Sequence, residues 1–203
     1  MYAGPWSVRT ESRSLAQFVA LLREPASLAT EVLEEWCGAP VTAEIRHRAD
    51  GQLLVPPAER TFGGGSAQAE RAPFLPPERV AELMRLSTGA RVQFRTVYLR
   101  AGTEKVVTAG AVVALERISP EEHAVLSTTN APLGPVLAAG GGVRRVMVTS
   151  EPTRLDPAVR PPCDADAPVL TVTALLCRGT MPVGLVREAF LPCLLDRDAV
   201  HDA

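Results

Sequence analysis

Cysteine and histidine are the residue types best suited to metal binding and nucleophilic attack, and the chain carries few of them. The cysteines lie far apart in sequence and none forms a C-x-x-C pair, which argues against a zinc site. The histidines fall in charged or acidic surroundings or near the C-terminus, where solvent exposure is expected. We therefore expect reduced, mostly buried thiols and no metal site. The residues concerned are Cys37, Cys163, Cys177, Cys193, His47, His123 and His201.

Two glycine runs have the composition of a phosphate-binding loop. Gly63-Gly64-Gly65-Ser66 follows no strand pattern in the required register, and neither Gly-Lys-Ser nor Gly-Lys-Thr comes after it. Residues 140–142 are three glycines behind a helical pattern, which is typical of a chain reversal. Neither run predicts a nucleotide site.

Arg95 and Glu188 are charged residues inside strand patterns. A guanidinium group binds a carboxylate in two places and keeps its charge, and a carboxyl group exchanges protons if burial raises its pKa. The alternative for Arg95 is the solvated face of its strand, and the alternative for Glu188 is a surface ion pair with Arg187. The strand patterns alone leave both alternatives open.

Composition limits the class of protein. Of the 203 residues, 46% are hydrophobic and 22% are charged, which is typical of one globular domain. The net charge of -2 and the pI near 6.0 predict no nucleic-acid partner. The longest apolar runs are too short to span a bilayer, and the polar N-terminus does not resemble a signal peptide. We expect a cytoplasmic protein, either a monomer or a weak homodimer, with no membrane partner.

Helix signals occur in five places along the chain. Apolar residues recur at helical spacing over residues 14–22, and Ser27 or Thr30 could cap a second helix that ends at Gly38. A third helix is predicted over residues 78–86. Ser119 begins a fourth with Pro120 in its first turn, and Pro132-Leu133-Gly134 begins a brief fifth.

Strand patterns occupy the remaining regular segments. Alternation predicts a strand over residues 41–46, and Asp50-Gly51 predicts a hairpin turn after it. A flexible loop is expected over residues 56–77. Hairpins without regular βαβ alternation indicate an antiparallel sheet with helices packed on it, in a single α+β domain over residues 1–203. The other predicted strands cover residues 91–100, 105–115, 143–149, 169–178 and 183–191.

Four short motifs, in this order, resemble the chorismate pyruvate-lyase family over most of the chain. Residues 28–34 (LATEVLE) take the place of the family's early helix, and residues 94–99 (FRTVYL) that of a strand with one arginine. Residues 130–134 (NAPLG) are similar to a Thr-Pro-Leu-Gly turn of the family, and residues 187–192 (REAFLP) to its terminal Glu-x-Phe-Leu-Pro.

The resemblance implies a chorismate lyase-like fold and the elimination of pyruvate from chorismate to give 4-hydroxybenzoate, for a quinone or a secondary-metabolite pathway. It implies that Arg95 holds a substrate carboxylate and that Glu188 is the acid/base partner. The Leu133 backbone N–H, next to Gly134, would bind a carboxylate. No metal or organic cofactor is implied.

Departures from the family pattern motivate two other hypotheses. Ala29 stands where relatives can carry a pocket-lining Met, Val32 replaces a basic residue, and residues 171–177 are apolar where the family often has arginines. An alternative is therefore a biosynthetic tailoring enzyme, a cyclase, dehydratase or other lyase, for a larger and less anionic substrate. The least favoured hypothesis is a non-catalytic module that binds a small effector, as in transcription regulators.

Overall fold

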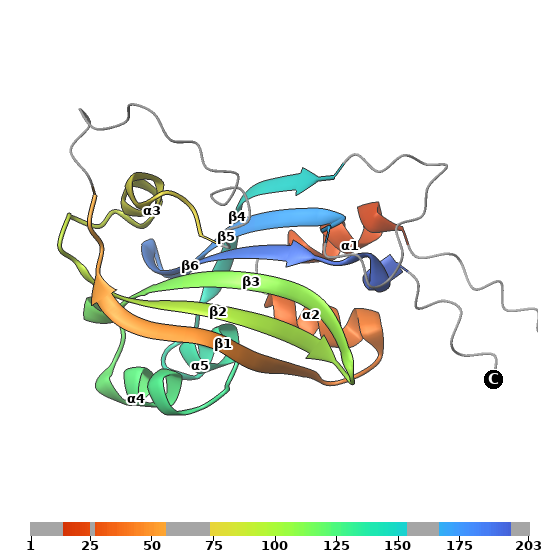
Figure 1. The fold of residues 1–203 in the computed structure, drawn as a ribbon, viewed down its shortest axis with the longest axis horizontal. Coiled ribbons are helices and arrows are strands. Elements are labelled where there is room, and N and C mark those ends of the chain that lie inside the picture. Colours follow the sequence, from red (N-terminus) through yellow and green to blue (C-terminus); the bar gives the residue numbers. More distant parts are fainter. Residues whose placement is uncertain (1–13, 25–26, 56–73, 154–166, 196–203) are drawn as a thin grey trace, which may run out of the picture.

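One antiparallel sheet of six strands organises the chain, in the order β1-β2-β3-β6-β5-β4 (Figure 1). The computed structural model describes residues 14–24, 27–55, 74–153 and 167–195. Every neighbouring pair of strands is antiparallel, so the predicted α+β class is confirmed. The strands are β1 (Val41–Gln52), β2 (Arg91–Ala101), β3 (Glu104–Ala114), β4 (Arg144–Pro152), β5 (Leu170–Arg178) and β6 (Met181–Phe190).

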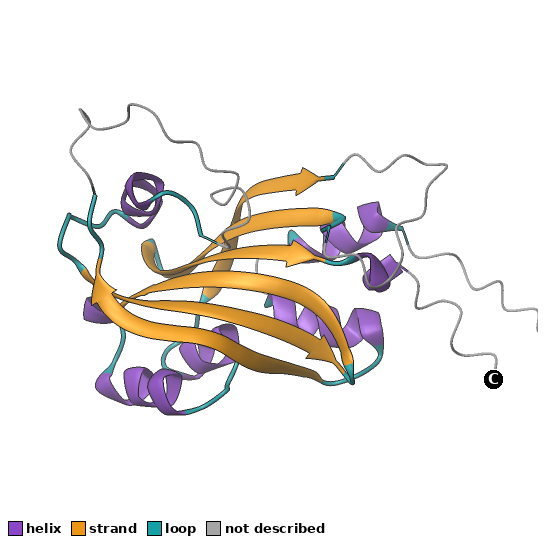
Figure 2. Ribbon diagram, viewed as in Figure 1, coloured by secondary structure: helices purple, strands orange, loops and turns teal. Residues whose placement is uncertain are grey.

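Helices cover both faces of the sheet (Figure 2). One face packs against α1, α2, α4 and α5, which bury Phe18, Leu33, Leu126 and Leu137 respectively. The opposite face packs against Val80 and Met84 of α3. None of the described helices has the length and apolarity that crossing a bilayer requires. The helices are α1 (Leu15–Leu22), α2 (Ala29–Cys37), α3 (Pro77–Met84), α4 (Pro120–Thr128) and α5 (Leu133–Ala139).

The helix ends follow the local sequence closely. The side chains of Ser14 and Ser119 each accept a hydrogen bond from the backbone N–H of the third helical residue, whose side-chain oxygen accepts one from the backbone N–H of the capping serine. The cap predicted for α2 was wrong, because Leu28 occupies that position and its N–H donates to Glu31 Oε2 at 3.0 Å. Gly38 ends α2 with φ at +62°, as its position predicted.

The hairpin predicted at Asp50-Gly51 was wrong. Strand β1 continues to Gln52, and Gly51 lies opposite Val92 of β2 in the antiparallel ladder. A register shift between Ile45 and His47 marks an irregularity in the middle of this long strand.

The flexible loop predicted for residues 56–77 falls mostly outside the described residues, which resume at Phe74. Pro77 begins α3 rather than ending the loop. Phe74 packs edge-to-face on Phe94, with the ring centroids 5.8 Å apart. The last residues of the predicted loop are therefore packed on the sheet.

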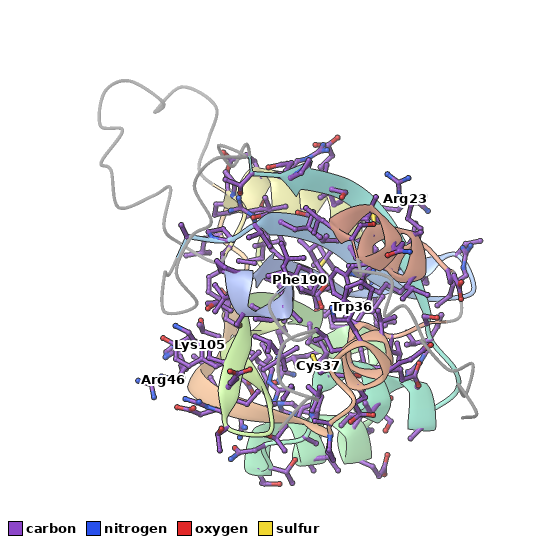
Figure 3. All side chains as sticks on the ribbon, turned by 90° about the vertical axis from the view of Figure 1, so that its right-hand side faces the viewer. Arg23, Trp36, Cys37, Arg46, Lys105 and Phe190 are labelled. Carbon is purple, nitrogen blue, oxygen red and sulfur yellow. The ribbon has the colours of Figure 1, made fainter. Side chains whose placement is uncertain are left out.

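The core at one end of the sheet is aromatic. Phe18 of α1 lies between Trp36 of α2 and Phe190 of β6, with ring centroids 5.1 Å away on each side. Trp36 Nε1 donates a hydrogen bond to the Leu194 carbonyl at 2.9 Å. Figure 3 shows Trp36 and Phe190 inside the molecule, whereas Arg23 and Arg46 point outward. These contacts fix α1 and α2 on the sheet.

The cysteines and histidines have the following surroundings. Cys177 and Cys193 are buried, Cys37 is half-buried, and Cys163 lies outside the described residues. Burial raises the pKa of the Cys177 thiol, which makes it a weak nucleophile at neutral pH. His123 lies 2.8 Å from Asp50 Oδ2 and is half-buried, so its expected solvation was only partly right.

Candidate functional site

Strand register creates a hollow on the sheet face that carries four helices. Arg95 of β2 lies opposite Ala111 of β3, which in turn lies opposite Val186 of β6. In the next row on that face, Ala109 of β3 lies opposite Glu188 of β6. Because both β3 side chains are single methyl groups, space remains above the central strand between Arg95 and Glu188.

The roof of this pocket comes from two segments. The first is the start of α2 at Leu28, Ala29 and Thr30, and the second is residues 131–134, which lead into α5. A Cβ atom on Gly134 would lie 3.3 Å from the Leu28 side chain, so glycine permits the close approach of the two segments.

The lining of the pocket is mainly apolar. The cavity volume is about 60 Å³, which exceeds the roughly 10–15 Å³ that one water needs. Of the described residues that line it, four have polar side chains, namely Thr30, Arg95, Arg145 and Glu188. The others are Leu28, Ala29, Ala43, Val97, Leu99, Ala109, Ala111, Ala131, Pro132, Leu133, Gly134, Leu176 and Val186.

Arg95 is a buried cation with unused hydrogen-bonding capacity. Its side chain is 1% exposed, and Nη2 donates to the Ala131 carbonyl at 3.2 Å. Its Nε and Nη1 have no hydrogen-bond partner among the residues that the structure describes. Burial, with a smaller contribution from the neighbouring charge of Arg48, lowers the pKa of Arg95 to about 10. At neutral pH the group is still charged, so Arg95 is a fixed cation that no described residue pairs with an anion.

Glu188 forms a buried ion pair on the other side of the pocket. Arg145 Nη2 lies 2.5 Å from Glu188 Oε2, and both side chains are almost completely buried. Arg145 Nη1 also donates to the Leu22 carbonyl at the end of α1, at 2.8 Å. The carboxylate is therefore neutralised by a residue from β4.

A polar network next to Arg95 connects β1 and β2 to the end of α4. Arg48, directly opposite Arg95 on β1, donates to the carbonyls of Ser127 and Thr129 at the end of α4. Gln93 Nε2 donates to Asp50 Oδ1 at 2.9 Å and to Ser127 Oγ at 3.1 Å. These bonds hold the segment that leads to Ala131 and the pocket roof.

All five predicted site residues, Ala29, Arg95, Leu133, Gly134 and Glu188, line this one pocket. The solvated alternative for Arg95 and the surface alternative for Glu188 were both wrong, since both side chains are buried. The role suggested for each residue, including the Leu133 N–H, stays a prediction.

Sequence reasoning missed Arg145 and Thr30. Arg145 lies in the predicted strand 143–149, but Arg144 precedes it and both strand faces carry apolar residues, so alternation could not show which arginine is buried. Thr30 reaches the pocket because α2 begins at Ala29, which the sequence did not predict. The Oγ1 atom of Thr30 is buried without a hydrogen-bond partner in the described segments.

Comparisons with known proteins identify the fold. The effector domain of PhnF from Mycobacterium smegmatis matches with a TM-score of 0.52 and 13% identity, over 83% of this chain and 90% of that one. A longer PhnF structure matches with a TM-score of 0.51 and 13% identity, over 81% of this chain and 64% of that one. The ligand-binding domain of a GntR-family transcriptional regulator from Bordetella bronchiseptica gives 0.46 and 17%, over 74% and 85%. No protein-family model and no curated protein matches the sequence.

The predicted chorismate pyruvate-lyase activity was wrong, as was the alternative of a tailoring cyclase, dehydratase or other lyase. The resemblance holds for the fold alone, because the matching structures named above are an effector domain, a longer structure of the same protein and the ligand-binding domain of a transcriptional regulator. The motifs that carried the resemblance build the fold and the pocket wall, which can serve binding as well as turnover. Glu188, the expected acid/base group, is engaged with Arg145.

Proposed function

We propose that this chain is a non-catalytic binding domain for a small organic anion, in which Arg95 holds the anionic group. The observation that carries the proposal is the buried Arg95 guanidinium, whose Nε and Nη1 have no partner within the described part of the chain. An unpaired buried charge costs several kcal/mol, roughly, unless something pairs with it. A carboxylate ligand would supply the missing charge and accept both unused N–H groups.

The rest of the pocket suits a compact apolar body. Apart from the charged residues and Thr30, the floor and walls present methyl, isopropyl and isobutyl groups, and the roof adds Ala29, Leu133 and Gly134. Apolar lining with a few convergent polar groups is typical of small-molecule sites. The fold, shared with the effector domain of PhnF, supports a binding role.

A regulatory role agrees with that fold, so the prediction that nucleic acid is not a partner, which was based on the slightly negative net charge, is not supported. A cytoplasmic location and a monomeric or weakly dimeric state stay predictions.

The test is a titration with three ligands of similar length: butyramide, butyrate and succinate, which are neutral, singly charged and doubly charged. Butyrate should bind more tightly than butyramide by about tenfold or more, since a charge-assisted pair to Arg95 is worth about 1.5–3 kcal/mol. Arg95→Met should abolish that preference. Arg91→Met is the matched control, because Arg91 lies on the same strand but is exposed.

Equal affinity for butyrate and butyramide, or a preference that survives Arg95→Met, would refute the proposal. The same incubations, analysed by chromatography, should return the ligands unchanged.

A further inference from the structure

The three charged residues of the pocket differ in their partners. Arg145 and Glu188 neutralise each other in an ion pair of 2.5 Å. Among the described residues, Arg95 donates a hydrogen bond only to the Ala131 carbonyl. Two arginines and one glutamate leave the lining with one net positive charge.

Both members of the ion pair face the ligand space as well as each other. They line the same pocket as Arg95, and their side chains are 2% and 8% exposed. At such burial a charge is screened weakly by water, so each acts on a ligand across the pocket. The contact of Glu188 with Arg145 is made by Oε2 of the carboxylate.

We infer that the Arg145–Glu188 pair sets the charge selectivity of the pocket, so that it accepts monoanions and rejects dianions. This inference rests on the proposed function. The first carboxylate of a ligand would neutralise Arg95. A second carboxylate would then meet the negative charge of Glu188, which is already paired with Nη2 of Arg145.

Arg145 is a positioning and specificity residue in this scheme. It cancels the Glu188 charge, which would otherwise oppose any anion in the pocket. It also connects the pocket to the end of α1 through the Leu22 carbonyl. Arg48 adds positive charge nearby, but its guanidinium is bound to carbonyls at the end of α4 and stays the same in every variant below.

A charge cycle tests the inference with butyrate and succinate, measured by NMR titration at pH 8. Glu188→Gln gives the lining a second net positive charge, so the ratio of succinate to butyrate affinity should rise about tenfold or more. Arg145→Gln removes the net charge and should weaken both ligands. The double variant Arg145→Gln/Glu188→Gln restores one net charge and should return to the wild-type ratio.

If the substitutions acted only through loss of packing, the double variant would bind both ligands most weakly of the three variants. Its ratio of succinate to butyrate affinity would then not return to the wild-type value. If Arg145→Gln does not fold, the comparison of Glu188→Gln with the double variant carries the same test. An unchanged ratio in Glu188→Gln, or a raised ratio that persists in the double variant, overturns the inference. Butyrate binding that is indifferent to Arg95→Met overturns the proposed function instead, so the two failures are distinguishable.

Discussion

At the scale of single residues, the buried Arg95 that suits anion binding also lowers the stability of the ligand-free protein. Its guanidinium leaves water on folding, yet only Nη2 gains a hydrogen bond within the described segments. Buried charges without an ionic partner are expensive, and they persist where a ligand supplies the partner.

Arg95→Met should therefore raise the free energy of unfolding of the ligand-free protein. The gain should be about 1–3 kcal/mol, because a well-packed apolar side chain replaces a buried charge. Denaturant unfolding measures it directly. The exposed Arg91→Met should change stability by no more than about 0.5 kcal/mol. A destabilised Arg95→Met protein would show that Arg95 has a structural partner.

The lowered pKa of Arg95 predicts how butyrate binding depends on pH. Burial lowers the pKa of the guanidinium to about 10, so the cation is fully present at neutral pH. Affinity should be constant from pH 7 to 9 and fall as the pH passes 10. The native protein then loses a proton that the unfolded chain keeps, so the Arg95 contribution to stability rises with pH in that window. A decline that is complete by pH 9 would assign the binding charge to another group.

At the scale of elements, the sequence predicted helices well because their signals are local. The Ser14 and Ser119 capping boxes and the left-handed Gly38 act within one helical turn. Strand ends are harder to predict, because a partner far along the chain decides them. Asp50-Gly51 has the composition of a tight turn, but pairing with Gln93 and Val92 of β2 keeps both residues in β1.

The substitution Gly51→Ala distinguishes a continuous strand from a tight turn at Asp50-Gly51. In a strand the new methyl group meets only Phe94 at 3.8 Å, an ordinary contact, and Gly51 is not among the glycines with positive φ. The free energy of unfolding should stay the same or rise by up to about 1 kcal/mol. In a tight turn with positive φ the same change would cost about 1–2 kcal/mol. Denaturant unfolding of the variant decides between them.

The Arg178–Glu122 pair fixes α4 and α5 against the end of β5. Glu122 caps α4 through Ser119 N at 2.8 Å and pairs with Arg178, which also donates to the Leu137 carbonyl of α5 at 3.0 Å. Arg178→Met should destabilise the protein by about 3–5 kcal/mol, because it leaves Glu122 buried without its cation.

The exposed Arg79–Glu82 pair offers the matched control for that substitution. Arg79→Met should cost no more than about 0.5 kcal/mol. Similar costs for the two variants, measured by thermal unfolding, would contradict the structural role given to Arg178.

At the scale of the whole molecule, the site depends on the sheet more than on any motif. Arg95 and Glu188 could be chosen from their strand motifs, but their positions around one hollow follow from the β2-β3-β6 register and from Ala109 and Ala111 on β3. Arg145 comes from the far edge of the sheet, on β4, and its pairing with Glu188 has no local signal. Function was harder to predict from the sequence than the site residues were, because one fold serves several functions.

The most direct test of an anion at Arg95 is the Nε–H resonance of its side chain in a ¹H–¹⁵N NMR titration with butyrate. The Arg95→Lys protein, which lacks this group, assigns the signal. We predict a downfield shift of the Arg95 Nε proton that saturates with butyrate and is absent with butyramide, because this N–H gains a charged acceptor. An Arg95 signal that stays in place while butyrate binds would contradict the account.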